Sequence, residues 1–235
     1  MEDLAPGEQG NQLTGCSVDD AALALEQAAK LHGPSWGMST LSDHALLSPG
    51  DPAEKTQQLK MIYTMVLPAF LERYSHRLPD EYIAVIEAMA DKLDRYQEIN
   101  KGPNSLVHLD FRLDNMMFGG PHKITVVDWQ SIALGCGVMD VSYFLGTSLL
   151  TASRLDNEEY LLKFYLDVLS SYKIDLDWNE CWHYYRAYAP SGLIMAVIAS
   201  MIVGETERGN DMFMAMATRS CQQIIELETL ELLRK

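Results

Sequence analysis

The chain has 235 residues, 48% of them apolar, so it can bury one substantial core. Its 33 acidic and 18 basic residues give a formal net charge of −15, which repels phosphate backbones and anionic lipid headgroups, and neither nucleic acid nor a membrane is expected as a partner. The four cysteines, Cys16, Cys136, Cys181 and Cys221, lie far apart without a CxxC motif, so neither a zinc site nor a disulfide framework is expected.

Nothing in the sequence predicts export or a membrane span. The first twelve residues, MEDLAPGEQGNQ, lack the basic and apolar regions of a secretory signal. The longest apolar run, residues 192–204, is shorter than the roughly 20 residues that a spanning helix needs, and it predicts a buried helix instead. We therefore expect a cytoplasmic protein.

Three helices are expected in the first hundred residues. The first follows the candidate N-cap Ser17 and ends near Gly33. The second begins at the candidate cap Asp51, which a first-turn proline follows. The third begins at Pro79 and runs toward Asn100 with apolar residues along one face. The first part of the chain is therefore expected to be a helical scaffold.

Residues 101–135 change the pattern. A short strand is expected to end at Val107, followed by a charged loop and a second short strand at residues 116–118. A glycine turn at residues 119–121 then leads into a Val-rich strand in KITVVDWQ. Helical patterns resume afterwards and continue to the C-terminus. The sequence thus predicts an α+β fold, mainly helical, with a small β-hairpin.

The loop HLDFRLDN carries an acid, a cation and an amide. Asp110 can orient and accept the proton of a hydroxyl nucleophile. Asn115, and Asp128 at the end of the Val-rich strand, offer the hard oxygen ligands that Mg²⁺ prefers. Arg112 would place a permanent cation beside a transferring phosphoryl group. The alternative is a charged turn without chemistry, which is disfavoured because two ordered motifs and their flanking strands occur together.

The motifs HLDFRLDNMMF, VVDWQ and GCGVMDVSYFLG together resemble the aminoglycoside phosphotransferase and choline-kinase-like superfamily, particularly its ecdysteroid kinase-like branch. The resemblance covers nearly the whole chain, residues 1–235, as a protein-kinase-like C-terminal lobe. Residues 1–16 resemble the hinge and the segment after it, residues 101–135 the catalytic and metal-binding hairpin, and residues 136–235 a helical subdomain. The family's strand-rich N-lobe precedes the hinge, so we expect that lobe to be absent here.

The resemblance implies a phosphotransferase that uses ATP and Mg²⁺ and acts on the hydroxyl of a small molecule. It makes Asp110 the catalytic base and Arg112 a cation on the phosphate side. It makes Asn115 and Asp128 the magnesium ligands. Because the N-lobe carries the glycine-rich loop and the lysine that grip ATP, the alternative is a non-catalytic, pseudokinase-like binding module or a truncated relic.

Supporting roles follow from the same resemblance. His108 would brace the catalytic loop, and Asp140 in GVMDVSYF would support it through hydrogen bonds. The hinge residues Glu2, Asp3 and Leu4 would offer backbone groups to adenine.

Other polar and aromatic residues are interpreted as structural. Asp114 is assigned to a local turn or a supporting contact, because Asp readily bonds its own backbone. The Trp and Tyr cluster in residues 178–188 is assigned to helix packing in preference to an acceptor pocket. The histidines outside the motif are expected to be packed or surface residues: His32, His44, His76, His122 and His183.

Overall fold

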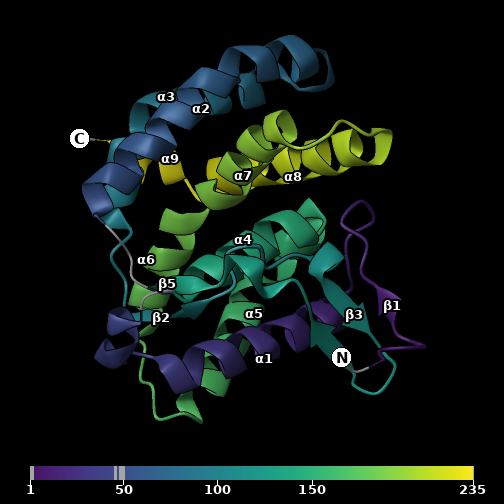
Figure 1. Cartoon of the computed structure of the whole chain (residues 1–235), viewed down its shortest axis with the longest axis vertical. Helices are drawn as coiled ribbons and strands as arrows, with labels where there is room; N and C mark the ends of the chain where they lie inside the picture. The colour runs from purple at the N-terminus through teal and green to yellow at the C-terminus, as the bar shows by residue number, and fades with distance from the viewer. Residues whose placement is uncertain (1–2, 45–46, 48–50, 235) are drawn as a thin grey trace.

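Helices form most of the chain, and the strands are short (Figure 1). The computed structural model describes residues 3–44, 47 and 51–234. In these ranges the strands are β1 (Glu8–Gln9), β2 (Asn104–Val107), β3 (Met116–Phe118), β4 (Ile124–Val126) and β5 (Ala133–Cys136). The α-helices are α1 (Val18–Ser35), α2 (Pro52–Tyr74), α3 (Asp80–Ile99), α4 (Val138–Ser148), α5 (Thr151–Ser170), α6 (Trp178–Tyr188), α7 (Pro190–Ile202), α8 (Glu207–Glu226) and α9 (Thr229–Leu232). Short 3₁₀ helices are η1 (Ser39–Asp43), η2 (Ser75–Arg77), η3 (Leu113–Asn115) and η4 (Trp129–Ser131).

The predicted helix starts are confirmed. The Ser17 hydroxyl accepts a hydrogen bond from the backbone N–H three residues on, at 3.1 Å, and caps α1. The Asp51 carboxylate accepts one from the backbone N–H two residues on, at 2.9 Å, and caps α2. Helix α3 begins directly after Pro79. Helix α1 passes Gly33 and ends at Ser35, because Trp36 takes an extended conformation and its backbone N–H donates to Gly33 O at 3.3 Å.

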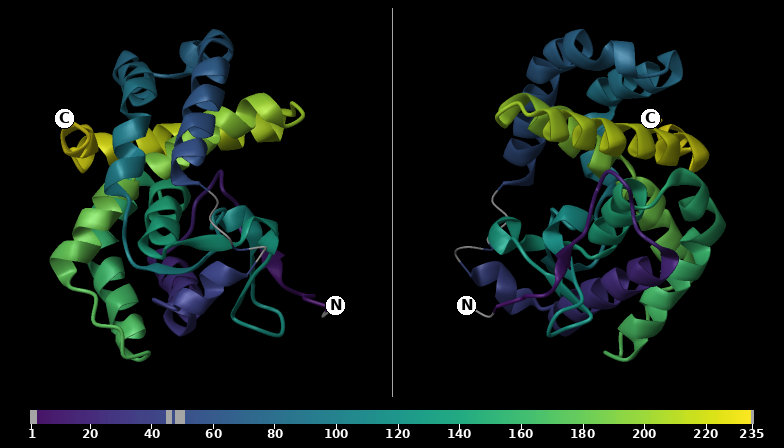
Figure 2. Two further views of the ribbon diagram at one scale, coloured as in Figure 1. Left: turned by 60° about the vertical axis from the view of Figure 1, so that its left-hand side comes forward. Right: turned by 90° about the vertical axis from the view of Figure 1, so that its right-hand side faces the viewer.

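The helices are stacked in layers (Figure 1). Helices α2 and α3 form a pair at one end of the molecule, with α7 and α8 next to it, α4 in the middle, and α1 and α5 side by side at the opposite end. In both turned views of Figure 2 the α2–α3 pair crosses α8 and extends above it. The buried apolar residues of these layers form one continuous core.

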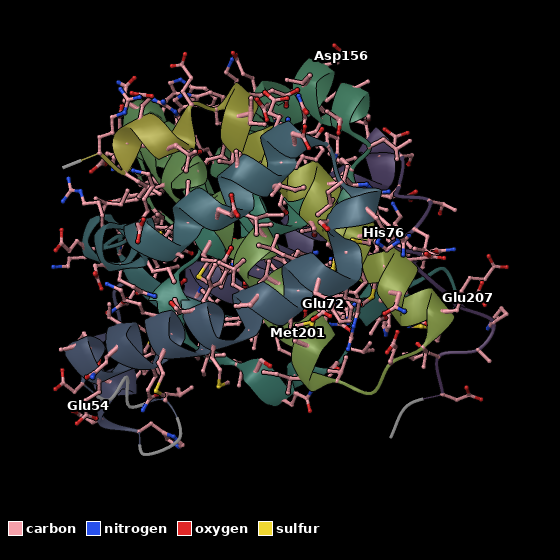
Figure 3. The ribbon with its side chains drawn as sticks, turned by 90° about the horizontal axis from the view of Figure 1, so that it is seen from above. Glu54, Glu72, His76, Asp156, Met201 and Glu207 are labelled. Carbon is pink, nitrogen blue, oxygen red and sulfur yellow. The ribbon has the colours of Figure 1, made fainter. Side chains whose placement is uncertain are left out.

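The C-terminal end of helix α2 is hydrogen-bonded to α7. Seen from above, α2 runs from Glu54 at one edge of the molecule to Glu72, which lies near Met201 of α7 (Figure 3). At this end Arg73 donates through Nη1 to the backbone oxygen of Ser200, 3.3 Å away. Toward its other end α2 borders a cavity that also reaches the charged loop.

The strands form two sheets, whereas the sequence predicted one hairpin. Strand β3 pairs antiparallel with β4, with Met116 opposite Val126, through a turn in which Gly119–Gly120 have positive φ. Strand β1 adds to the other edge of β3. The strand that ends at Val107 does not join this hairpin, because it pairs with β5, with Val107 opposite Ala133. Strand β5, with the sequence ALGC, is short and contains a glycine, so it has no alternating pattern to predict it.

The stretch Trp178–Ile202 is the one part of the described chain that is long and apolar enough to cross a membrane. It comprises α6 and α7, and 67% of its most apolar window is buried inside the fold. Burial of this kind is typical of a core helix, as the sequence predicted for residues 192–204.

Because α7 packs closely against α4 and α8, adding one methyl group at Gly192 should destabilise the fold. A Cβ added at Gly192 would lie 2.5 Å from Ser220 Oγ on α8 and 2.5 Å from Thr147 Cγ2 on α4, and both side chains are fully buried. Gly192→Ala should therefore lower the free energy of unfolding by about 1–3 kcal/mol in urea denaturation. At Gly204, where an added Cβ meets nothing within 4 Å, the same substitution should change it by less than about 0.5 kcal/mol. Equal effects would contradict this packing.

Candidate active site

The charged loop is held in place by Asp140 in the first turn of α4. The Asp140 carboxylate is 1% exposed and accepts hydrogen bonds from two successive backbone N–H groups, His108 N to Oδ2 at 2.6 Å and Leu109 N to Oδ1 at 2.9 Å. Leu109 has a φ of +65°, which costs an L-residue on the order of 1–2 kcal/mol. The two hydrogen bonds stabilise this conformation. The supporting role that the resemblance implies for Asp140 agrees with these contacts.

A buried histidine on α1 fixes the Asp140 side chain in turn. His32 is fully buried, with Nε2 3.2 Å from Asp140 Oδ2 and Nδ1 2.8 Å from the Tyr165 hydroxyl on α5. Burial raises the pKa of Tyr165 well above its ordinary value of 10.0, so the hydroxyl keeps its proton and can donate to Nδ1. Nε2–H is then available to donate to Asp140. His32 is packed, as predicted, and it also supports the loop.

His108, whose predicted role is to brace the loop, is also fully buried. Its Nε2 lies 3.0 Å from the backbone oxygen of Val127, the residue before Asp128. Its ring packs against Trp129, with the ring centroids 4.9 Å apart. His108 therefore joins the loop to the end of the β3–β4 hairpin.

Three side chains orient the carboxylate of Asp110. Arg112 Nε donates to Oδ1 at 2.9 Å, the Tyr143 hydroxyl donates to Oδ1 at 3.1 Å, and Asn115 Nδ2 donates to Oδ2 at 2.8 Å. Burial is the largest cause that raises the pKa of Tyr143 well above 10.0, so this hydroxyl stays protonated as a donor. The Asp110 side chain is 20% exposed, which leaves it open to a ligand.

The magnesium-binding roles of Asn115 and Asp128 stay predictions, and the structure shows which of their atoms are available. Asn115 donates through Nδ2 to the backbone oxygen and to Oδ2 of Asp110. The side-chain oxygen Oδ1 of Asn115 is therefore the atom that can coordinate a metal ion. Val127 N donates to Asn115 O at 2.9 Å, which brings Asp128, at the next position, beside the end of the β3–β4 ladder. Asp128 is exposed, and no residue of the described ranges bonds to its carboxylate.

This donor set fits Mg²⁺, which protein sites commonly bind through one or two carboxylates together with phosphates and water. Within residues 3–44, 47 and 51–234, no group of three or more His, Cys, Asp or Glu side chains could hold a metal ion. The chain therefore supplies part of a coordination sphere, which a nucleotide and water would complete.

Arg112 lies between two carboxylates. Its Nε bonds Asp110, and its Nη1 lies 3.3 Å from Asp114 Oδ2. Asp114 is 7% exposed and also accepts from Gln12 N at 2.9 Å and from both terminal nitrogens of Arg208 at 3.0 and 3.1 Å. Asp114 thus makes supporting contacts, as the sequence analysis assigned. The predicted contact of Arg112 with a phosphate stays a prediction.

Gln12 is a supporting residue that the sequence analysis missed. It is fully buried, its Oε1 accepts from Leu113 N at 3.0 Å, and its Nε2 donates to Thr147 O at 2.7 Å. These bonds tie the N-terminal segment to the loop and to α4. A glutamine in the polar stretch GEQGNQ has no sequence pattern that distinguishes it from a surface residue.

The predicted hinge residues are only partly described. Glu2 lies outside the described residues. Asp3 Oδ1 accepts from Ala5 N at 3.0 Å, and Leu4 O accepts from Gly7 N at 2.7 Å. The contact of this segment with adenine stays a prediction.

An apolar cavity of about 380 Å³ borders the charged loop at Leu109. Two of its lining residues link it to Asp110, because Leu109 precedes Asp110 in the charged loop and Tyr143 bonds the Asp110 carboxylate. The opposite walls come from α2, α3 and α7. Of the aromatic cluster, Trp178 and Trp182 stack on each other in α6, as packing predicts, whereas Tyr188 lines this cavity.

A sequence profile of the ecdysteroid kinase-like family matches residues 1–177. The chain belongs to the ecdysteroid kinase-like family. The resemblance drawn from the three motifs is thereby confirmed. A comparison with curated proteins gives no match.

Solved structures show the same fold for this ecdysteroid kinase-like chain. A protein described as an aminoglycoside phosphotransferase from Ralstonia eutropha has 18% identity and a TM-score of 0.56, over 93% of this chain and 70% of that one. A Plasmodium vivax ethanolamine kinase has 11% identity and a TM-score of 0.54, and the match covers 94% of this chain and 63% of that one. A spectinomycin phosphotransferase in complex with ADP and spectinomycin has 12% identity and a TM-score of 0.53, and the match covers 94% of this chain and 69% of that one. The chain thus spans 63–70% of the length of these kinases.

Asp140→Asn tests how the loop is held. An amide has one oxygen to accept with, so one of the two N–H groups of His108 and Leu109 should lose its buried partner. We expect the free energy of unfolding in urea to fall by about 1–3 kcal/mol. The control Asp156→Asn changes an exposed carboxylate on α5 and should leave stability nearly unchanged. Equal stability of the two variants would show that the loop does not depend on Asp140.

Asp114 should make stability depend on pH. Burial alone would raise its pKa, but the hydrogen bonds from Arg208 and Gln12 and the charge of Arg112 outweigh burial and lower the pKa from its ordinary 3.8. The ionised carboxylate therefore stabilises the fold above pH 3.8, and this contribution is lost as the pH falls through the lower folded-state pKa.

The measurement is urea denaturation of the unmodified chain and of Asp114→Asn at several pH values. The difference in free energy of unfolding between the unmodified chain and Asp114→Asn should be constant above about pH 5 and should shrink below pH 3.8. A difference that is the same across this window would contradict the assigned pairing.

Proposed function

We propose that this chain is the catalytic lobe of a phosphotransferase that moves the γ-phosphoryl group of ATP to the hydroxyl of a small molecule. The main support is the Asp110 carboxylate, which three donors orient on a loop that borders an apolar cavity at Leu109. Asn115, one of these donors, accepts from the backbone N–H of Val127, the residue before the exposed Asp128. Family membership and the kinase fold support the same reaction class.

In this proposal Asp110 accepts the proton of the acceptor hydroxyl. Oδ1 already receives two hydrogen bonds from side chains and Oδ2 receives one, so Oδ2 has more capacity for a further donor. As the acceptor oxygen bonds to the γ-phosphorus, the bond from phosphorus to the β–γ bridging oxygen breaks and ADP leaves. The hydroxyl proton moves to Asp110. Arg112 keeps a positive charge beside this carboxylate throughout, since burial is outweighed by Asp110, Tyr143 and Asp114, which raise its pKa.

Asn115 and Asp128 would hold Mg²⁺ through Oδ1 and the carboxylate, respectively. The ion, when bound, neutralises negative charge on the ATP phosphates. The chain's own contribution is to keep Asn115 oriented through its two hydrogen bonds to Asp110.

The cavity favours an acceptor alcohol with an apolar body. Its lining includes Met139, Met195 and Ile198, and contains no Asp, Glu, Lys or Arg among the described residues. A polycation such as an aminoglycoside would find no carboxylate on these walls, even though the whole chain carries a charge of −15. We include a cytoplasmic location in the proposal, where ATP is available and the four cysteines, which are unpaired, stay reduced.

The test is Mg²⁺-dependent release of ADP. The chain is assayed with ATP, alone and with a strand-rich N-terminal lobe joined before Met1, against sterols, choline, ethanolamine and aminoglycosides. Asp110→Asn and Asp128→Asn should each lower kcat about a hundredfold or more, because each removes an acid–base or charge-stabilising group. Asp156→Asn is the matched control for loss of a surface carboxylate and should retain activity.

Unchanged kcat in both site variants would show that the assigned roles are wrong. No turnover with any acceptor, with the N-terminal lobe joined, would favour the alternative of a non-catalytic binding module.

A further inference from the structure

We propose that Leu109 determines which acceptors reach Asp110, because it lines the cavity directly before this residue in the chain and holds a backbone conformation that a glycine would adopt without strain. This inference rests on the proposed function, since it assigns the cavity to the acceptor.

The backbone of Leu109 is in a conformation that its side chain disfavours. Among the described residues, those other than glycine with positive φ are Leu109, Asp128, Lys173 and Glu228, and Leu109 is the only apolar one. A glycine would adopt a φ of +65° without steric strain. Strain of this kind persists where the surrounding structure enforces it, and it is concentrated at functional sites.

The hydrogen bonds of the loop do not require a leucine. Leu109 is held through its backbone N–H, which donates to Asp140 Oδ1 at 2.9 Å, and the preceding His108 N–H bonds the other oxygen. A glycine at this position would offer the same N–H to the same carboxylate. Any contribution specific to leucine therefore comes from its side chain.

Leu109 lines the 380 Å³ cavity. Met139 and Tyr143 of α4 and Ile198 of α7 line the same space. Tyr143 donates to Asp110 Oδ1 at 3.1 Å, and Leu109 is the residue directly before Asp110. Leu109 and Tyr143 are thus the lining residues directly linked to Asp110, the carboxylate that an acceptor hydroxyl would meet.

A branched side chain at this point limits the width of the acceptor near its hydroxyl. A slender chain with a terminal hydroxyl can pass beside an isobutyl group, whereas a compact, caged alcohol needs the space that this group fills. Removing the side chain should therefore favour bulky alcohols and reduce apolar contact with linear ones.

The experiment measures binding of two alcohols to the chain itself by isothermal titration calorimetry, so that it needs no turnover. The probes are 1-octanol, which is linear, and 1-adamantanol, which is caged. Leu109→Gly should shift the ratio of their dissociation constants by about tenfold or more in favour of 1-adamantanol. Leu109→Ala, which shortens the side chain but keeps the strained Cβ, should shift the ratio in the same direction and remains informative if the glycine variant does not fold.

The matched control is Leu59→Ala, which removes an apolar side chain from the α2 wall of the same cavity. This substitution should weaken the binding of both alcohols to a similar extent and leave the ratio of their dissociation constants unchanged. An unchanged ratio in both Leu109 variants, or no binding of either alcohol to the unmodified chain, would overturn the inference. A shifted ratio together with no ADP release from any acceptor would overturn the proposed function and leave Leu109 as the gate of a binding cavity.

Discussion

The geometry of the candidate site depends on the buried carboxylate of Asp140. A buried charge is tolerated only when it is fully paired, and this one accepts two backbone N–H groups from the loop and contacts His32. It also lies in the first turn of α4, where the helix dipole favours a negative charge. Through Asp140 and His32, helices α1, α4 and α5 all fix the path of the loop, so the layered packing of the helices determines where Asp110 points.

Asp110 lies at a boundary between polar and apolar surroundings. On one side are the polar groups of Arg112, Asn115 and Asp128, which suit phosphate and a divalent cation. On the other side is the cavity between the loop and α2, α3 and α7, whose walls carry no charged side chain in the described ranges. Helices α2 and α3 each contribute residues to its walls. The packing that orients the Asp110 carboxylate therefore places it between a polar group of side chains and an apolar cavity.

Local patterns in the sequence predicted the local structure well. Ser17 and Asp51 cap helices because the capping hydrogen bonds reach only two or three residues along the chain. The β3–β4 hairpin follows from the glycine turn between two apolar strands. The pairing of β2 with β5 and the contacts of Gln12 were missed, since they join residues about 30 and more than 100 positions apart and no local pattern encodes them.

The sequence by itself determined the residue types and order of the motif, the helical scaffold around it and the family to which the chain belongs. Those features depend on spacing along one strand, helix or loop. Tertiary structure alone decided that His32 supports Asp140, that Tyr143 bonds Asp110 and that an apolar cavity borders the charged loop. The physical reason is that burial, and hydrogen bonds between distant segments, are properties of the packed helices together.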